Sequence, residues 1–342
     1  MKNLKKVLAL VLAFACAFTM FAGAAFTDQA DIKVDADVVD TLVSLGVIEG
    51  FEDGSFQPNA TVTRAQMAKM IYVLRTGNSD ASAYNDDKTS FTDIGSHWAR
   101  GYIKYCQSLG IIAGKSSTIF APNATVTAQE AAKMLLVTLG YDANKAGLVG
   151  VNWAAKTNAL ADENGLLDDV NTSFTAACPR QYAAQLIYNA IDTATVVWRD
   201  DAYTNQNYNG DDNKTIGEKY MDLYKTSAEV LTSVKKTSGK DTYEIKLADK
   251  VKYADDKKEQ EFTKVPTDVS DLLGLKVKVL VRVKTNGDQD VYGVYADDDS
   301  KVIATGTVGQ LENVSSDSMK TKMNGTEYKL DKANNKLKVI YA

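Results

Sequence analysis

The chain has 342 residues, of which 45% are hydrophobic and 24% are charged, and its formal net charge is −5. This length allows two or three domains with packed cores, and the acidic balance argues against nucleic acid as a partner. His97 is the single histidine, which excludes a Ser-His-Asp triad or a histidine-based zinc site from the carboxy-terminal half.

The first 25 residues are predicted to be a secretory signal. Three lysines precede an apolar run over 7–21 and small residues over 22–25, which are the three parts of such a signal. A transmembrane anchor is the alternative, but the run is shorter than the roughly 20 residues that a spanning helix needs. We expect cleavage after Ala24 or Ala25, which removes Cys16 and the three lysines and so changes the formal charge from −5 to −8. No other segment is expected to span a membrane.

An internal repeat follows. The hexapeptide PNATVT occupies 58–63 and again 122–127, a spacing of 64 residues, and the register holds without a gap from Leu45 and Leu109 onwards. A third, weaker and shorter copy begins near Asn152. Self-similarity of this kind indicates duplicated helical units that share one core. The three predicted repeats cover 26–77, 91–140 and 148–192.

Each copy is predicted to form a helix, a structured loop and a second helix. Three apolar residues at helical spacing mark the first helix of the first copy: Val38, Leu42 and Leu45. Gly46 then supplies the left-handed residue that ends it. Capping boxes open the second helix in the first two copies, and they pair Thr63 with Gln66 and Thr127 with Glu130. Pro179 takes the threonine slot in the third copy.

Two cysteines remain after cleavage, Cys106 and Cys178. They could form a disulfide in an exported chain. Cys106, however, occupies the apolar helix position that Leu42 holds in the first copy, so a buried free thiol is expected.

The composition changes after residue 192. Residues 193–215 are rich in Asp, Asn, Tyr and Gly and indicate a linker or extended wrap. From 216 to 342 the apolar residues alternate with period two, and turn signals occur at Asn286–Gly287, Asn324–Gly325 and 297–299. This pattern predicts a β-rich domain, a small barrel or sandwich. The predicted fold is therefore α+β and multidomain, with an all-α three-repeat region followed by the β-rich domain.

The acidic turns at 211–213 and 297–299 carry the oxygen ligands that calcium prefers, but neither matches a twelve-residue calcium loop. We therefore predict no metal site and no cofactor.

Several motifs in register resemble the S-layer homology family: FTDIGSHWA at 91–99, LGII followed by Gly114, Phe120 with Pro122, and TRAQ at 63–66. The resemblance covers roughly 26–192. It implies three modules around a pseudo-threefold axis, which anchor secreted bacterial surface proteins to the cell wall. It also implies binding of a negatively charged, often pyruvylated, secondary cell-wall polysaccharide in the grooves between the modules.

The resemblance also implies which residues bind the glycan. The family arginine corresponds to Arg64 and Arg180, and Ala128 takes this slot in the second copy. The matching tryptophans and loop glycines are Trp98, Trp153, Gly50 and Gly114, with Gln66 completing the set. No copy has every element, because Val34 replaces the tryptophan in the first copy and Asp169 replaces the glycine in the third.

Elementary electrostatics supports the two arginines separately. Each is expected at the first position of a helix, where a cation is disfavoured by roughly 0.3–1 kcal/mol. An anionic ligand would remove this penalty through charge-assisted hydrogen bonds. The alternatives are an exposed Arg64 or its pairing with a nearby carboxylate such as Asp53. For Trp98 and Trp153 the alternative to stacking on a sugar is core packing between repeats, and His97 is expected to brace a helix start.

Three functions are compatible with these features. The first is a non-catalytic wall anchor that binds the anionic polysaccharide. The second is a structural subunit whose β-rich domain self-associates in a surface layer. The third is a wall-glycan hydrolase, which needs two carboxylates at a suitable separation, whereas the acidic residues of the β-rich domain cluster in turns.

Overall fold

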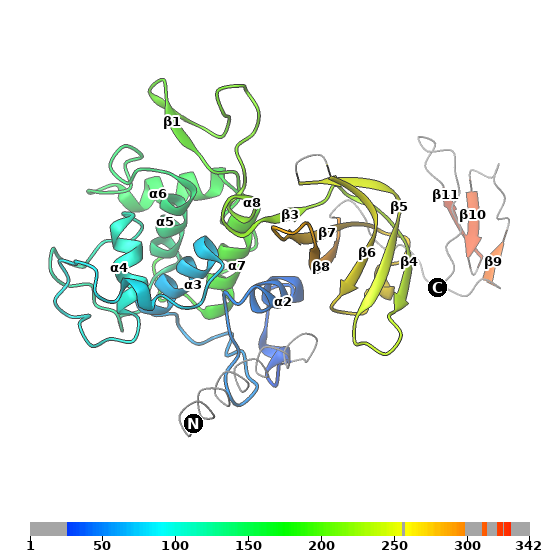
Figure 1. Ribbon diagram of the computed structural model, residues 1–342, viewed down its shortest axis with the longest axis horizontal. Helices are drawn as coiled ribbons and strands as arrows, with labels where there is room; N and C mark the ends of the chain where they lie inside the picture. Colours follow the sequence, from blue (N-terminus) through cyan, green and yellow to red (C-terminus); the bar gives the residue numbers. More distant parts are fainter. Residues whose placement is uncertain (1–25, 255–256, 298–309, 313–319, 324, 330–342) are drawn as a thin grey trace. The chain divides into compact units, whose positions relative to one another are not determined.

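The computed structural model describes residues 26–254, 257–297, 310–312, 320–323 and 325–329 (Figure 1). The predicted signal segment, residues 298 and 299 and Asn324 lie outside the described residues. Within the described part, no helix is long and apolar enough to cross a membrane. The described residues fall into two compact units. The helical unit runs to Tyr224 and includes Val281–Gly293, and the β-rich unit contains Lys225–Leu280 and the described residues from Val294 on.

Three helix pairs make up most of the helical unit. They are α2 (Ala36–Ser44) with α3 (Arg64–Thr76), α4 (Arg100–Ser108) with α5 (Ala128–Leu139), and α6 (Trp153–Glu163) with α7 (Arg180–Ile191). Two short 3₁₀ helices, η1 (Gln29–Asp31) and η2 (Ser82–Tyr84), accompany them. A glycine with φ of 69°, 70° and 69° follows the first helix of each pair, at Gly46, Gly110 and Gly165. The predicted helix, loop and helix therefore recur in all three copies.

The capping boxes predicted for α3 and α5 are confirmed. The Thr63 amide donates to Gln66 Oε1 at 2.9 Å, and the Gln66 amide donates back to the Thr63 hydroxyl at 3.2 Å. Thr127 and Glu130 make the same reciprocal pair at 3.0 and 3.2 Å. Pro179 precedes α7 without a side-chain cap. Each cap satisfies two amides that helix geometry would otherwise leave without a partner.

The loops that lead into α3, α5 and α7 bond to one another in a closed ring. Val62 donates to the Cys178 carbonyl at 3.0 Å, Cys178 to Val126 at 2.8 Å, and Val126 to Val62 at 2.9 Å. Bridges join Thr61 to Pro179, Thr63 to Thr125 and Thr127 to Ala177. Around this ring the first helix of each pair packs on the second helix of another, with α4 on α3, α6 on α5 and α2 on α7 (Figure 1). The three pairs therefore share one core.

Both remaining cysteines are buried and free, as predicted for Cys106. Cys106 lies on α4 and Leu42 lies at the corresponding place on α2, and neither side chain is exposed. Cys178 lies in the ring of loop bonds. Burial raises the pKa of each thiol to about 12, which keeps both protonated and unreactive at neutral pH.

Residues 193–215, predicted to be a linker or extended wrap, contain a β-hairpin. Strands β1 (Val197–Arg199) and β2 (Ala202–Thr204) pair antiparallel. The Tyr203 ring lies 4.6 Å from the Tyr141 ring, and its hydroxyl accepts from the Asp142 amide at 2.8 Å. The hairpin is therefore held on the helical unit by side-chain contacts that composition does not reveal. A short helix, α8 (Ile216–Met221), follows with its own capping box and packs on α3.

The period-two segments form strands, as predicted. A six-stranded sheet has the order β3-β7-β4-β5-β6, with β8 paired to β7. Its strands are β3 (Leu223–Lys225), β4 (Glu229–Lys236), β5 (Tyr243–Tyr253), β6 (Lys257–Val265), β7 (Lys276–Val283) and β8 (Gln289–Ala296). The 3₁₀ helix η3 (Ser270–Leu272) precedes β7. In β5, Ile245 and Leu247 are buried while Glu244 and Lys246 are exposed, so the alternation reflects one covered face.

The predicted Asn286–Gly287 turn joins β7 to β8, where Gly287 has a φ of 86° and the Asn286 side chain accepts from the Asp288 amide. A separate three-stranded sheet contains β9 (Leu311–Glu312), β10 (Lys320–Met323) and β11 (Thr326–Lys329). The described residues thus combine helices with antiparallel sheet, which is the predicted α+β class.

Candidate functional site

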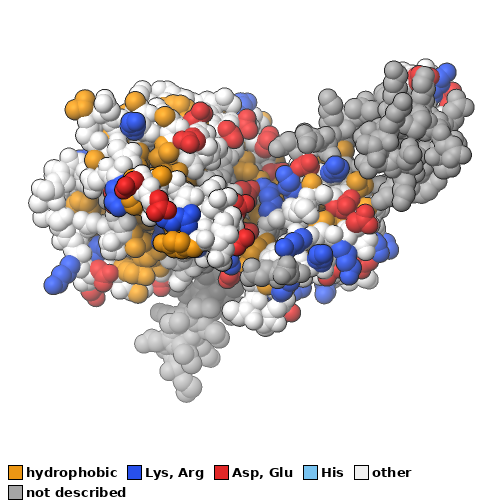
Figure 2. All heavy atoms as spheres, turned by 90° about the horizontal axis from the view of Figure 1, so that it is seen from above, with side chains coloured by type: hydrophobic (Ala, Val, Ile, Leu, Met, Phe, Trp, Pro, Cys, Tyr) orange, Lys and Arg blue, Asp and Glu red, His pale blue; other side chains and the backbone are white. Residues whose placement is uncertain are grey.

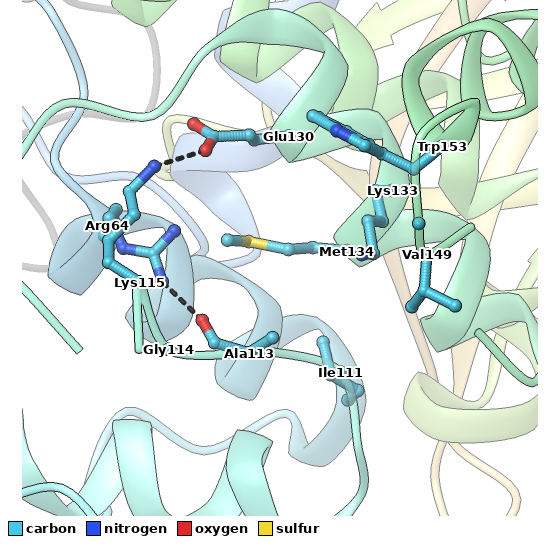
Figure 3. Close-up of a pocket in the computed structure, with 11 residues that line it drawn as sticks. Arg64, Ile111, Ala113, Gly114, Lys115, Glu130, Lys133, Met134, Val149 and Trp153 are labelled. Atoms are coloured by element: carbon cyan, nitrogen blue, oxygen red, sulfur yellow. Dashed lines mark hydrogen bonds and ion pairs between the residues drawn. The ribbon is translucent and has the colours of Figure 1, made fainter. Parts of the chain in front are cut away.

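A cavity of about 260 Å³ opens in the helical unit where the three helix pairs meet (Figure 3). Its wall comes from the start of α3, the loop after α4, the exposed side of α5 and the start of α6. The lining residues are Arg64, Ile111, Ala113, Gly114, Lys115, Glu130, Lys133, Met134, Val149, Gly150 and Trp153. The structure therefore brings together three residues of the predicted glycan-binding set, namely Arg64, Gly114 and Trp153.

Arg64 joins α3 to the loop of the second helix pair. Its side chain is only 3% exposed. Nε donates to the Phe120 carbonyl at 2.9 Å and Nη2 to the Ala113 carbonyl at 2.5 Å, and the guanidinium lies 4.5 Å from the centre of the Phe120 ring. Burial lowers the pKa of Arg64, and the charges of Glu130 and Asp93 act in the opposite direction. These bonds use two of the five N–H donors that a guanidinium carries.

The predicted exposure of Arg64 is wrong, and the carboxylates whose charges act on it are Glu130 and Asp93 rather than Asp53. The side chain is buried, and the Asp53 carboxylate instead accepts from the amide and hydroxyl of Ser55 at 2.9 and 2.6 Å. Arg64 is the first residue of α3, as predicted.

Arg180 repeats this arrangement between the third and first helix pairs. Its Nη2 donates to the Glu49 carbonyl, and the guanidinium lies 5.1 and 5.2 Å from the rings of Phe51 and Phe56. Burial lowers the pKa of Arg180 to about 10, although the charge of Glu49 raises it. Its Nε is buried without a hydrogen-bond partner in the described part of the chain. Arg180 lies outside the cavity that Arg64 lines.

Besides Arg64, the charged residues that line the cavity are two lysines and a glutamate, namely Lys115, Lys133 and Glu130. Lys115 Nζ lies 2.5 Å from Glu130, and Lys133 Nζ lies 5.4 Å from the centre of the Trp153 ring (Figure 3). Burial favours a raised pKa for Glu130, but hydrogen bonds from Lys115 and Thr127 and the charge of Arg64 lower it overall. Burial lowers the pKa of Lys133. Three cations and one carboxylate give the lining a net charge of +2, which favours an anion.

Lys115, Lys133 and Glu130 line the cavity but were not predicted as site residues. Glu130 was recognised only as a helix cap. Lys133 follows it by three residues, so both lie on the same face of α5. The repeat register puts Lys69 in the corresponding place on α3, where it pairs with Glu49 at 3.2 Å. That recurrence was the signal which could have revealed Lys133.

The predicted residues Gly114, Gly50 and Gln66 have positions or roles that the backbone explains. A Cβ on Gly114 would lie 2.2 Å from the Ser116 carbonyl oxygen, so only glycine fits this loop. Gly50 is half-buried beside Glu49. Gln66 is occupied by its capping box. None of these roles requires a ligand.

The two predicted tryptophans differ in exposure. Trp98 is 57% exposed, with its ring edge-on to Tyr102, so it is not part of the core, and it does not line the cavity. Trp153 is half-buried and faces Lys133. Next to Trp98, His97 Nδ1 accepts from the Ala99 amide at 3.1 Å, and it therefore braces the start of α4 as predicted.

Two aspartates hold the loops that carry the buried phenylalanines. Asp28 accepts from the amides of Phe56 and Gln57 at 2.8 and 2.7 Å, and Asp93 accepts from those of Phe120 and Ala121 at 3.0 and 2.7 Å. Gln57 and Ala121 have φ of 55° and 59°, a conformation that is costly for residues other than glycine. The repeated Phe-Thr-Asp at 26–28 and 91–93 was the signal for these clamps.

Replacing Asp93 with alanine is expected to destabilise the helical unit by about 1 kcal/mol, because two loop amides lose their acceptor. Burial favours a raised pKa for Asp93, but hydrogen bonds from Phe120 and Ala121 and the charge of Arg64 lower it overall. Because its pKa is lowered in the folded state, the ionised Asp93 carboxylate stabilises the protein fully at a pH above the ordinary aspartate pKa of about 3.9. This stabilisation is lost as the pH falls through the folded-state pKa. The difference between wild type and Asp93→Ala should therefore shrink at low pH.

Urea unfolding followed by tryptophan fluorescence measures this difference, because all three tryptophans lie in the helical unit. Asp53→Ala is the matched control, since Asp53 is also exposed and bonds only within its own turn. A pH-independent difference for Asp93→Ala would contradict the assigned role of the carboxylate.

Comparison with known proteins places the repeats in a family. The S-layer homology domain model matches residues 25–68 and 90–132, which cover the first two helix pairs in part. A cell surface protein of Thermoanaerobacter kivui is 28% identical over 337 residues, 97% of this chain and 41% of that protein. A surface layer protein of Brevibacillus choshinensis is 30% identical over 181 residues, 51% of this chain and 16% of that protein.

A cellulosome-anchoring protein of Acetivibrio thermocellus is 28% identical over 110 residues, 32% of this chain and 25% of that protein. The chain spans less than half the length of each of these relatives. The duplicated helix pairs, the family model and the surface-protein relatives agree with one another. The chain therefore carries S-layer homology domains at residues 25–68 and 90–132, and its relatives include proteins named as cell surface and surface layer proteins.

Proposed function

We propose that the helical unit is a three-module anchor which holds this protein at the bacterial cell wall by binding an anionic, pyruvylated or otherwise acidic, secondary cell-wall polysaccharide. The observation that carries the proposal is the cavity at the meeting of the three helix pairs, with three cations, one carboxylate and a half-buried indole. An acidic sugar suits this lining because the cations meet its charge and the apolar side chains meet its C–H groups.

A third module at 148–192 is part of this proposal, although the family model does not extend to it. Its support is the repeated backbone geometry. The loop before α7 occupies one of three equivalent places in the ring of hydrogen bonds, and Gly165 has the same φ as Gly46. A pseudo-threefold arrangement would follow from these equivalent contacts.

Within the cavity, we assign direct contact with the acidic group to Lys115 and Lys133. Arg64 is bonded to two carbonyls and cannot move without breaking them, so it supplies fixed positive charge and its remaining N–H groups. Each lysine instead ends in a compact ammonium on a flexible four-carbon stem. Trp153 positions the Lys133 ammonium beside its ring, since such pairs attract when partly desolvated.

A second groove at Arg180 and Gly50 is proposed from the same arrangement, with Glu49 and Phe56 in the places of Ala113 and Phe120. The Arg180 Nε is buried without a hydrogen-bond partner among the described residues, which supports a hydrogen-bond acceptor of the ligand at that position. Trp98, exposed at the start of α4, is proposed as a surface contact to sugar.

Binding is favoured over hydrolysis because Glu130 is the single carboxylate among the residues lining the cavity, whereas glycoside hydrolysis uses a pair of acids. Assembly in a surface layer through the β-rich unit is the second candidate, and a relative named as a surface layer protein favours it.

The anchor is tested by replacing Lys115 and Lys133 with glutamine together. We expect at least about tenfold weaker co-sedimentation with purified acidic wall polysaccharide, because hydrogen bonds to charged groups contribute about 1.5–3 kcal/mol each. The matched control is Lys236→Gln with Lys240→Gln, which removes the same charge from exposed positions of the β-rich unit. Wild-type binding by the cavity variant, or undiminished binding after the acidic substituents are removed from the glycan, would refute the proposal.

A further inference from the structure

A lysine above a tryptophan ring occurs twice in the helical unit. Lys133 lies 5.4 Å from the centre of the Trp153 ring in the cavity, and Lys145 lies 5.0 Å from the centre of the Trp198 ring on the β1–β2 hairpin. The loop between α5 and α6 connects the two pairs, because it carries Lys145 and ends at Trp153. The same chemical pair therefore occurs twice, once with its lysine in this loop and once with its tryptophan at the residue that follows the loop.

The hairpin holds Trp198 in place while leaving it open to solvent. Trp198 lies opposite Tyr203 in the strand pair, with the two rings edge-on at 4.8 Å. Tyr203 is in turn packed on Tyr141 and bonded to the Asp142 amide. Trp198 nevertheless remains 40% exposed. A rigid, partly exposed indole binds with little loss of conformational freedom.

The loop between the two pairs is itself apolar at its tip. Val149 is 44% exposed and lines the cavity, and Val151 is fully exposed. Figure 2 looks onto the face from which the hairpin projects in Figure 1, and it shows hydrophobic side chains gathered over the helical unit with basic side chains among them. The loop that carries Lys145 therefore also offers exposed apolar surface, at Val149 beside the cavity and at Val151.

We propose that Trp198 and Lys145 form a second sugar subsite, which takes a further acidic unit of the same polysaccharide chain that enters the cavity. The sugar C–H groups pack on the exposed part of the indole, and the acidic substituent meets the Lys145 ammonium that the ring holds beside it. The subsite rests on the proposed anchor function. It lies outside the two segments that match the family model, so it belongs to this chain's own hairpin.

A polymer makes such a subsite effective. Once one unit is held in the cavity, the next units are presented to the hairpin at a high effective concentration, so a weak second contact strengthens the binding of the whole chain. A fragment with one repeat unit can occupy the cavity alone and gains nothing from the hairpin. Affinity for the polymer and affinity for the fragment therefore respond differently to changes in Trp198.

The experiment compares two probes, the purified acidic wall polysaccharide and a one-repeat fragment of it that retains its acidic substituents. Trp198→Ala in the full mature chain is expected to weaken binding of the polymer about five- to tenfold, as loss of one aromatic contact does, and to leave binding of the fragment unchanged. Trp198→Phe should retain most of the affinity, and Lys145→Gln should reproduce the loss. Leu109→Ala, at a residue that is 43% exposed, is the control for removing exposed apolar surface.

The lysine variant of the cavity separates this inference from the anchor proposal. If Lys115→Gln with Lys133→Gln weakens binding of both probes while Trp198→Ala binds the polymer like wild type, the subsite is wrong and the anchor stands. If the cavity variant binds both probes like wild type, the anchor fails and the subsite fails with it. An equal loss for both probes in Trp198→Ala overturns the subsite as well, because it places the effect in the cavity. Circular dichroism melting checks that every variant is folded.

Discussion

Replacing Phe120 with alanine is expected to destabilise the helical unit by about 3–5 kcal/mol, the range for removing a buried aromatic side chain. Phe120 is fully buried, its ring lies 5.4 Å from that of Phe91, and the Arg64 guanidinium covers it at 4.5 Å. The variant therefore loses packing, leaves a void and removes the ring from beneath a buried cation. Urea unfolding followed by tryptophan fluorescence is the measurement.

Two companion variants show whether this loss is specific. Phe56→Ala removes the corresponding ring of the first copy, which is also fully buried and lies beside Phe26 and Arg180, and it should cost a similar amount. Tyr208→Ala removes a ring that is 91% exposed and should change stability by less than about 0.5 kcal/mol. A Phe120→Ala variant as stable as Tyr208→Ala would show that the second copy does not pack as described.

Arg64→Ala should destabilise the same unit by about 2–4 kcal/mol, because the carbonyls of Phe120 and Ala113 lose a charged donor in a buried place. The guanidinium is 3% exposed and joins two helix pairs. Arg64→Lys retains the charge but not the planar fork that reaches both carbonyls, so an intermediate loss is expected. Arg180→Ala should cost less, since Arg180 donates to one carbonyl and its Nε already has no partner in the described part of the chain.

The control for Arg64→Ala is Arg100→Ala, which removes a half-buried arginine from the first position of α4. Unfolding in urea measures stability, and co-sedimentation with wall polysaccharide measures binding. Unchanged stability for Arg64→Ala would mean that the two carbonyl bonds contribute nothing in solution.

The structural role of the arginines changes how glycan binding is best tested. A variant lacking Arg64 and Arg180 would lose contacts between helix pairs, so its loss of binding would not separate a missing ligand contact from a disturbed fold. Lys115 and Lys133 reach the cavity from one loop and one helix and bond no carbonyl of another pair among the described contacts. Their replacement therefore tests the cavity chemistry with less disturbance of the framework.

Local signals in the sequence predicted the helical elements well. Thr63 and Gln66 form a capping box because both partners lie within one turn of helix. Gly46 ends α2 because the left-handed conformation is a property of that residue and its neighbours. The alternation around Ile245 predicted β5 for the same reason, since a strand with one covered face needs only its own residues to display the pattern.

Features that depend on distant segments were not predicted. The sequence predicted only a linker or extended wrap where the β1–β2 hairpin lies, because the contact that holds the hairpin, Tyr203 on Tyr141, joins residues 62 apart in sequence. Asp93 was quoted only as part of a motif, although its bonds to Phe120 and Ala121 hold the loop. The charge of the cavity was also missed, since Lys115 and Lys133 are ordinary lysines until the loop and α5 bring them beside Arg64.

By itself, the sequence determined the duplicated helix pairs, the S-layer homology resemblance of the first two and the positions of Arg64 and Arg180 at helix starts, because periodicity, caps and repeat register are encoded over short stretches of chain. Only the tertiary structure decided what those arginines touch and which cations line the cavity. The reason is that burial and hydrogen-bond partners arise when separate segments meet, and a residue's neighbours along the chain do not specify its neighbours across the ring of loops.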